Sequence, residues 1–143
     1  MGRRYVVSAL ALLLLAGAGQ AAAPADVSLC DISRNPERYV GRPVHTRADL
    51  IDVSPHGWFL EDRDCDAIVE FGGYADDVTA QRMMNILMPW TLRSGPGGHL
   101  YISVTGTVSV RKNEAGRMAP YFAITDIDAA ELTTKHRNLS AKD

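Results

Sequence analysis

Alternation of apolar and polar residues predicts five β-strands along this chain. From Val44 to Leu50, Val, Thr, Ala and Leu alternate with His, Arg and Asp, which is typical of a strand with one buried face. The same alternation from Leu100 to Val110 predicts the longest strand, with Gly106 in its middle, where glycine permits a bulge or a sharp bend. Three shorter apolar runs bounded by turn residues complete the set, at 58–61, 67–71 and 121–127.

Turn residues separate these strands. Ser54-Pro55-His56-Gly57 breaks the chain after the first strand, and the polar residues 62–66 form the next turn. We expect Gly72-Gly73 to close the third strand, and the polar residues 113–117 to join the last two.

Two helices are predicted from capping residues and periodicity. Ser28 followed by Asp31 resembles a capping box that opens a short helix over 29–33. Asp76 or Asp77 can cap a second helix, which we expect to run from Val78 to Met88 and to end at Pro89. Its predicted apolar stripe consists of Ala80, Met83, Met84 and Leu87.

The order of three strands, one helix and two strands matches the OB-fold, a five-stranded Greek-key barrel. We therefore predict an all-β fold with one helix, preceded by the short N-terminal helix, over residues 24–132. The polar residues 133–143 are predicted to form a disordered tail.

Two segments resemble known proteins. Asn35-Pro36-Glu37-Arg38-Tyr39-Val40-Gly41-Arg42-Pro43-Val44 and Val104-Thr105-Gly106-Thr107-Val108 resemble the exported OB-fold proteins of the tRNA-anticodon-binding-like group in bacterial envelopes. One departure is Ala48, where the pattern of that group usually carries glycine. The resemblance implies the same barrel and leaves the function open.

The N-terminus has the layout of a secretory signal peptide over residues 1–23. Arg3 and Arg4 precede an uncharged apolar run from Val6 to Ala16, and small residues then offer cleavage near Ala21 or Ala23. The run is shorter than the roughly 20 residues of a membrane-spanning helix, and no other apolar stretch is long enough. We therefore expect a periplasmic or secreted protein.

Charge disfavours nucleic acid as a partner. The whole chain has a net charge of −2. Loss of Arg3 and Arg4 leaves 13 basic against 17 acidic residues, a net charge of −4. This mildly acidic balance lacks the basic footprint of a nucleic-acid binder.

Cys30 and Cys65 both lie beyond the cleavage site. An even pair in an exported protein predicts one disulfide, and two buried free thiols are the alternative. A catalytic dithiol is disfavoured because the two cysteines lack C-x-x-C spacing. Lipid attachment at Cys30 is disfavoured by its distance from the apolar run and by the large Leu29 before it.

A ligand surface is expected where OB-folds usually bind, on strands two and three between the one–two and four–five loops. Trp58, or Phe59 on the opposite parity, would form an aromatic platform for a sugar, a nucleotide or an acidic peptide. In the alternative, one of these rings fills the barrel and the basic residues only solvate the loop. The other predicted ligand residues are Arg47, His56, Arg111, Lys112 and Arg117.

Motifs for metal binding and catalysis are weak. Asp62, Asp64 and Asp66 resemble the first half of a calcium loop, but Ala67 and Gly73 replace the glycine and glutamate that it requires. We read this stretch as a solvated turn tethered by Cys65. The four histidines are scattered, and the sequence contains none of the usual hydrolase motifs. We predict no metal, no cofactor and no catalytic residue.

The predicted function is a non-catalytic binding or accessory domain of the cell envelope that contacts a protein or a glycan. The hydrophobic corner Met88-Pro89-Trp90 would suit a protein contact. The alternative is a small-ligand or oligosaccharide binder that uses the barrel face. A metal-dependent hydrolase or nuclease is a third, weaker alternative.

Overall fold

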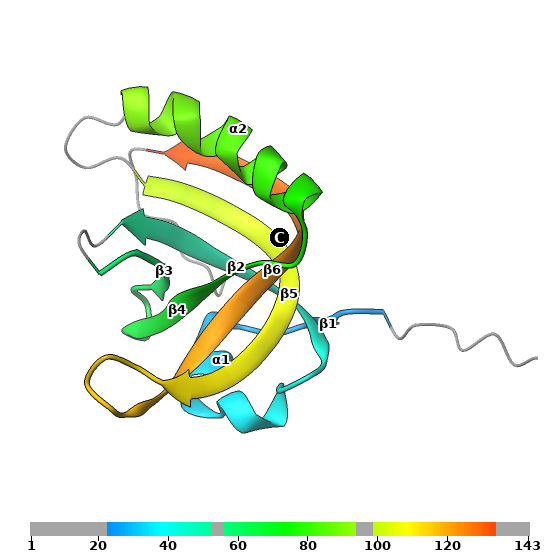
Figure 1. Cartoon of the computed structure of the whole chain (residues 1–143), viewed down its shortest axis with the longest axis vertical. Coiled ribbons are helices and arrows are strands. Elements are labelled where there is room, and N and C mark those ends of the chain that lie inside the picture. The colour runs from blue at the N-terminus through cyan, green and yellow to red at the C-terminus, as the bar shows by residue number, and fades with distance from the viewer. Residues whose placement is uncertain (1–22, 53–55, 94–98, 134–143) are drawn as a thin grey trace, which may run out of the picture.

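A mixed β-sheet that closes on itself forms the body of the protein (Figure 1). The computed structural model describes residues 23–52, 56–93 and 99–133. The barrel strands pair in the order β2-β3-β4-β6-β5, and β5 pairs again with β2. All of these pairs are antiparallel except β4 with β6. The strands are β2 (Pro43–Asp52), β3 (Trp58–Asp62), β4 (Ala67–Tyr74), β5 (His99–Lys112) and β6 (Met118–Thr133).

A sixth strand is present that the sequence pattern does not predict. β1 (Ala25–Asp26) has only two residues and pairs in parallel with the start of β2, through Ala25 with Val44 and Asp26 with His45. A strand of two residues is too short to show an alternation of apolar and polar positions, so its pairing is decided by contact with β2. The prediction of five strands therefore holds for the closed barrel and omits this short addition.

The N-terminal helix forms as predicted and ends one residue later. α1 (Leu29–Arg34) is capped by the Ser28 hydroxyl, which accepts a hydrogen bond from the Asp31 backbone N–H at 3.1 Å. A 3-10 turn, η1 (Pro36–Arg38), follows at once. α1 packs against β3 and β4, and its Leu29 and Ile32 are buried in the core.

The second helix, α2 (Asp77–Arg93), is longer than predicted. Its cap is Asp76, whose carboxylate accepts a hydrogen bond from the Thr79 backbone N–H at 2.7 Å. Pro89 does not end the helix, which continues to Arg93. A proline removes its own N–H from the helical ladder and its ring crowds the carbonyl four residues earlier, and here both effects fall in the last turns of the helix. Figure 1 shows α1 and α2 at opposite ends of the barrel.

The predicted apolar stripe of α2 is only partly buried. Met83 and Leu87 are buried, four residues apart on one face, whereas Met84 is 47% exposed. One step along a helix rotates a side chain by about 100°, so Met84 cannot share the buried face that Met83 occupies.

Two glycine sites shape the barrel wall. Gly72-Gly73 does not close β4 but lies inside it, where the pairing with β6 shifts register between Phe71 and Tyr74. Gly73 has a φ of +102°, which favours glycine. At Gly106 the predicted bulge is confirmed, because the register with β6 shifts between Thr105 and Gly106.

The barrel interior contains the apolar residues of every barrel strand. Val44, Ala48 and Leu50 are buried as predicted, and Thr46 is buried with them. The expectation of one buried face fails at Asp49, which is also buried. Asp49 is paired on one side with Glu61 and on the other with Tyr101, so strands flank it on both sides.

Predictions at the two ends of the chain lie largely outside the described residues. Of the predicted signal peptide only Ala23 is described, and of the predicted tail only Thr133, the last residue of β6. Within residues 23–52, 56–93 and 99–133, no helix has the length and apolar character needed to cross a membrane.

Candidate functional site

A cleft of ≈ 230 Å³ lies between two loops that are far apart in the sequence. One loop precedes β3, and the other is the hairpin turn between β5 and β6. The floor between them comes from β3 and β4. The lining residues are His56, Phe59, Glu70, Asn113, Glu114 and Ala115.

The floor of the cleft is built by cross-strand pairing. Phe59 of β3 is paired with Glu70 of β4, and Glu70 is paired with Tyr121 of β6. Directly paired residues project from the same face of a sheet. An aromatic ring, a carboxylate and a phenol therefore lie side by side across three strands.

The hairpin turn on the other side is held by its own hydrogen bonds. The Asn113 backbone N–H donates to the Arg117 carbonyl, and the Gly116 N–H donates to the Asn113 carbonyl, both at 2.8 Å. The Arg117 N–H also donates to the Asn113 side-chain oxygen at 3.0 Å. Gly116 has a φ of +73°, which favours glycine. This bonding fixes the backbone that presents Glu114 and Ala115 to the cleft.

Electrostatic contacts connect the two sides of the cleft. His56 Nδ1 lies 3.7 Å from Glu114 Oε2, so the two loops attract each other when His56 is protonated. Glu70, which accepts a hydrogen bond from the Tyr121 hydroxyl, raises the pKa of Tyr121 above its ordinary value. Tyr121 is therefore a neutral hydrogen-bond donor at neutral pH. The guanidinium of Arg111 stacks over the Tyr121 ring, 5.2 Å from its centroid.

The lining has acidic rather than basic character. Glu70 and Glu114 contribute two carboxylates, and among the described residues that line the cleft there is neither lysine nor arginine. This differs from the predicted aromatic surrounded by cations, since Arg111 contacts Tyr121 beside the cleft. A site of this charge suits neutral or cationic ligands better than phosphates or acidic peptides.

The predicted ligand residues are only partly brought together. His56 lines the cleft, and the aromatic residue there is Phe59, while Trp58 packs against the core. Lys112 and Arg117 are exposed at the hairpin and do not belong to the lining. Arg47 lies on β2, paired with Ser103, and is not a lining residue either.

Several lining residues were not identified from the sequence. The predicted turn over residues 62–66 joins two strands into a hairpin. If that turn is taken as the centre of the hairpin, Glu70 falls opposite Phe59, so the sequence contained a signal for it. Asn113, Glu114 and Ala115 lie in the predicted turn over 113–117, from which only the basic Arg117 was predicted to bind a ligand. At the corner Met88-Pro89-Trp90, Met88 is exposed, and the side chain of Trp90 lies outside the described part of the chain.

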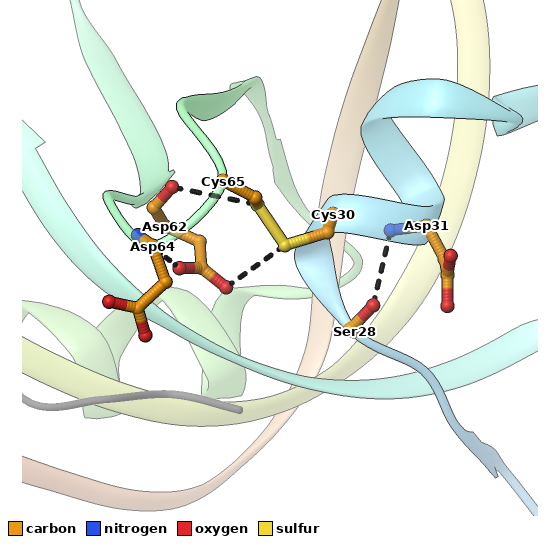
Figure 2. The surroundings of a disulfide bond; sticks show 6 residues. All are labelled: Ser28, Cys30, Asp31, Asp62, Asp64 and Cys65. Carbon is orange, nitrogen blue, oxygen red and sulfur yellow. Dashed lines mark hydrogen bonds between the residues drawn. A yellow bond between two sulfur atoms is a disulfide. The ribbon is translucent and has the colours of Figure 1, made fainter. Parts of the chain in front are cut away.

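The predicted disulfide is confirmed. Cys30 of α1 and Cys65 of the β3–β4 turn are bonded, with their Cα atoms 6.1 Å apart. The bond tethers the N-terminal helix to this hairpin, as Figure 2 shows. An oxidised pair is typical of proteins outside the reducing cytoplasm.

A buried carboxylate lies beside the disulfide. Asp62 is 2% exposed, and its Oδ2 lies 3.4 Å from the Cys30 sulfur. Its Oδ1 accepts a hydrogen bond from the Asp64 N–H at 3.0 Å. The Cys65 sulfur lies 3.7 Å from the Asp62 carbonyl oxygen. Neither bonded sulfur carries a proton, so the two sulfur–oxygen approaches in Figure 2 are contacts in this oxidised state. The prediction of a solvated turn is therefore wrong at Asp62.

A second polar cluster joins four strands around His45. Its Nδ1 lies 3.0 Å from Asp26 of β1, and its Nε2 lies 2.8 Å from the Ser103 hydroxyl of β5. Asp128 of β6 lies 3.5 Å from the same Nε2. The order Asp–His–Ser is that of a serine hydrolase triad. However, Ser103 is buried in mid-strand and paired with both neighbouring strands, which leaves a substrate little access. This cluster is better explained as a structural one, in which the contact of His45 with Asp26 stabilises the position of β1 on the barrel.

Comparisons of the chain with protein-family models, with curated proteins and with solved structures give no match. The cleft and the polar clusters are therefore interpreted from their own geometry.

Proposed function

We propose that this protein is an exported binding domain of the OB-fold class, which holds a neutral oligosaccharide of the cell envelope in the cleft between His56 and the β5–β6 hairpin. The strand order β2-β3-β4-β6-β5, with α2 between β4 and β5, supports the OB-fold assignment and the resemblance to the exported anticodon-binding-like group. The cleft lies over the second and third barrel strands, between the loops that OB-folds use for ligands.

The observation that carries the proposal is the combination of groups on the cleft floor. Phe59 offers an apolar ring, and Glu70, Asn113 and Glu114 offer hydrogen-bonding side chains around it. Sugars present a face of C–H groups and a rim of hydroxyls, so a ring can cover the face while carboxylates and amides bond the rim.

Charge argues against an anionic ligand. Two carboxylates in the lining would repel a phosphate or an acidic peptide at close range. This argument also separates the chain from the nucleic-acid binders of the same fold, which present basic grooves.

Export is supported by the disulfide and by the signal-peptide pattern of residues 1–23. In a periplasmic or secreted setting, glycans and envelope proteins are the abundant partners. An exported protein would therefore share its compartment with the proposed ligand class, the neutral envelope oligosaccharides.

The direct test is binding to an array of neutral, cationic and anionic envelope oligosaccharides. Mature protein should bind a subset of the neutral members, and Phe59→Ala should weaken that binding by at least about tenfold, as loss of a central aromatic contact does. Val78→Ala is the matched control, because Val78 is 71% exposed on α2, a helix that contributes nothing to the lining. Preference for anionic members, or equal binding by Phe59→Ala, would remove the proposal.

A protein contact through α2 is the second candidate. Val78, Met84 and Met88 are exposed on this helix, and of the exposed residues between them Gln81 and Asn85 are uncharged, while Arg82 is paired with Asp126. Exposed apolar side chains gathered on one element are typical of interaction surfaces. A photo-crosslinking residue at position 88 in the exporting cell should give one defined adduct, and the same residue at Lys112 should not. Absence of an adduct at position 88 would exclude this contact.

A further inference from the structure

Three possible metal ligands from separate segments meet at the disulfide. Cys30 comes from α1, Asp62 from the end of β3, and Cys65 from the turn that follows. Their ligand atoms all lie within 4.8 Å of one another. We propose that, once the disulfide is reduced, Cys30, Cys65 and Asp62 bind a thiophilic divalent cation of the zinc class, so that the pair alternates between a disulfide and a metal site.

The carboxylate is already oriented for this role. Oδ1 of Asp62 is held by the Asp64 N–H, which leaves Oδ2 directed at the Cys30 sulfur (Figure 2). A ligand whose second atom is fixed by a hydrogen bond costs little entropy when it binds a metal. Asp62 is buried, so its carboxylate is in place before any ion arrives.

The fold holds the two cysteines together without the covalent bond. Leu29 and Ile32 flank Cys30 on α1 and are fully buried in the core, so reduction leaves α1 anchored beside the β3–β4 turn. In the reduced protein each thiol also has an acceptor nearby, the Asp62 carboxylate for Cys30 and the Asp62 carbonyl for Cys65. The sulfurs therefore remain close enough to share one ion.

Charge favours a cation at this place. Two thiolates and the Asp62 carboxylate would bring three negative charges together, and the exposed Asp64 and Asp66 lie in the same turn. A divalent ion neutralises most of this charge. Thiolate ligands favour zinc over calcium, so the calcium-loop spacing of this turn does not decide the metal.

The chemistry balances as two separate steps. A thiol reductant, such as an envelope dithiol oxidoreductase, supplies two electrons and two protons, which split the disulfide into two thiols while the reductant's own thiol pair becomes a disulfide. The ion then displaces one proton from each thiol and binds both thiolates and the carboxylate, so two protons leave for each ion bound. Water completes the four-coordinate shell.

The test uses the mature protein, reduced with a phosphine under anaerobic conditions and titrated with Co²⁺ as the probe. The expected result is a thiolate-to-cobalt charge-transfer band that saturates at one ion per chain, and no band in the oxidised protein. Zn²⁺ should bleach the band and should slow maleimide alkylation of both cysteines by at least about tenfold. A reduced, folded protein without the band would overturn the proposal.

Two variants separate this site from a simple dithiol. Asp62→Asn should weaken Co²⁺ binding by at least roughly tenfold, and Asp64→Asn, an exposed carboxylate of the same turn, should change it by less than about twofold. Equal affinity in Asp62→Asn and the wild type would overturn the three-ligand site. If Asp62→Asn fails to fold, Asp62→Glu replaces it: retained charge transfer with altered d–d bands supports carboxylate ligation, and an unchanged spectrum contradicts it.

Discussion

Phe59 and Glu70 lie directly opposite each other across β3 and β4, which places an aromatic ring beside a carboxylate on the floor of the cleft. Neither residue alone defines a ligand class. Together they form a surface that is apolar at Phe59 and able to accept hydrogen bonds at Glu70, which also accepts one from the neutral phenol of Tyr121 beside the cleft. This relationship is the basis of the proposed glycan site.

Glu70→Gln should separate hydrogen bonding from charge in this cleft. The amide keeps an acceptor beside Phe59 and removes the negative charge, so binding of a neutral oligosaccharide should weaken by less than about fivefold. Binding of an anionic analogue should improve at the same time. Calorimetric titration of both ligands measures the two changes, and a loss of neutral binding as large as that of Phe59→Ala would contradict the role assigned to the ring.

Removing the disulfide should destabilise the protein. The bond closes a loop with a sequence separation of 35 residues, for which the loop-entropy model gives about 4 kcal/mol. We expect Cys30→Ser with Cys65→Ser to melt about 15 °C lower than the oxidised wild type in scanning calorimetry. Reductant should lower the melting temperature of the wild type and leave that of the double variant unchanged. A double variant that melts within about 2 °C of the wild type would contradict the stabilisation assigned to the bond.

Gly106→Ala should be among the most damaging single substitutions in the barrel. A Cβ at this position would overlap the Ala123 carbonyl oxygen and the buried Phe122 ring, where β5 pairs with β6. We expect a loss of about 3 kcal/mol or more in the free energy of unfolding, measured by urea denaturation.

Gly41→Ala is the control for this experiment. Gly41 has a φ of +71° with no atom within 4 Å of the added Cβ, so only backbone strain of about 1 kcal/mol is expected. Equal losses at the two positions would mean that the close approach at Gly106 is relieved by a shift of the strands.

Asp76 should make stability sensitive to acid. The Thr79 backbone N–H donates to its carboxylate, and this hydrogen bond lowers the pKa of Asp76 below its ordinary value of 3.8. A carboxyl group with a lower pKa in the folded state stabilises the protein fully above the unfolded pKa. That contribution is lost as the pH falls through the folded pKa, so the window lies below about pH 4.

Asp76→Asn keeps a helix cap but does not titrate. The difference between its urea midpoints at pH 6 and pH 3 should therefore be smaller than that of the wild type. Asp77→Asn removes the same charge one residue later, without the bond to Thr79, and is the matched control. An unchanged pH dependence in Asp76→Asn would contradict the assignment.

Local chemistry explains why much of the fold was predictable. Several predicted features depend only on residues close together in the sequence. These are the helix caps at Ser28 and Asp76, the bulge at Gly106 and the alternation over 44–50 and 100–110. The Cys30–Cys65 pairing followed from the presence of two cysteines in a chain with a predicted signal peptide.

The predictions that were wrong share a different cause, which is the influence of tertiary contacts on local structure. Gly72-Gly73 resembles a turn, but it lies close to β6 and forms an irregular part of the β4–β6 pairing inside a strand. Pro89 resembles a stop signal, yet the helix tolerates it near its end. Along β3, Trp58, Phe59 and Leu60 are apolar in succession, so parity could not decide which ring faces outward. The acidic character of the cleft was also not predicted, because Glu70 and Glu114 are far apart in the sequence and line the same cleft only in the closed barrel.

The most direct test of the central claim is to map backbone amide chemical shifts during titration of the mature, isotope-labelled protein with the neutral oligosaccharide that binds best on the array. We expect saturable shifts concentrated at His56, Phe59, Glu70 and residues 113–115, and their loss in Phe59→Ala. Shifts concentrated on α2, or no saturable shift with any neutral oligosaccharide of the panel, would contradict it.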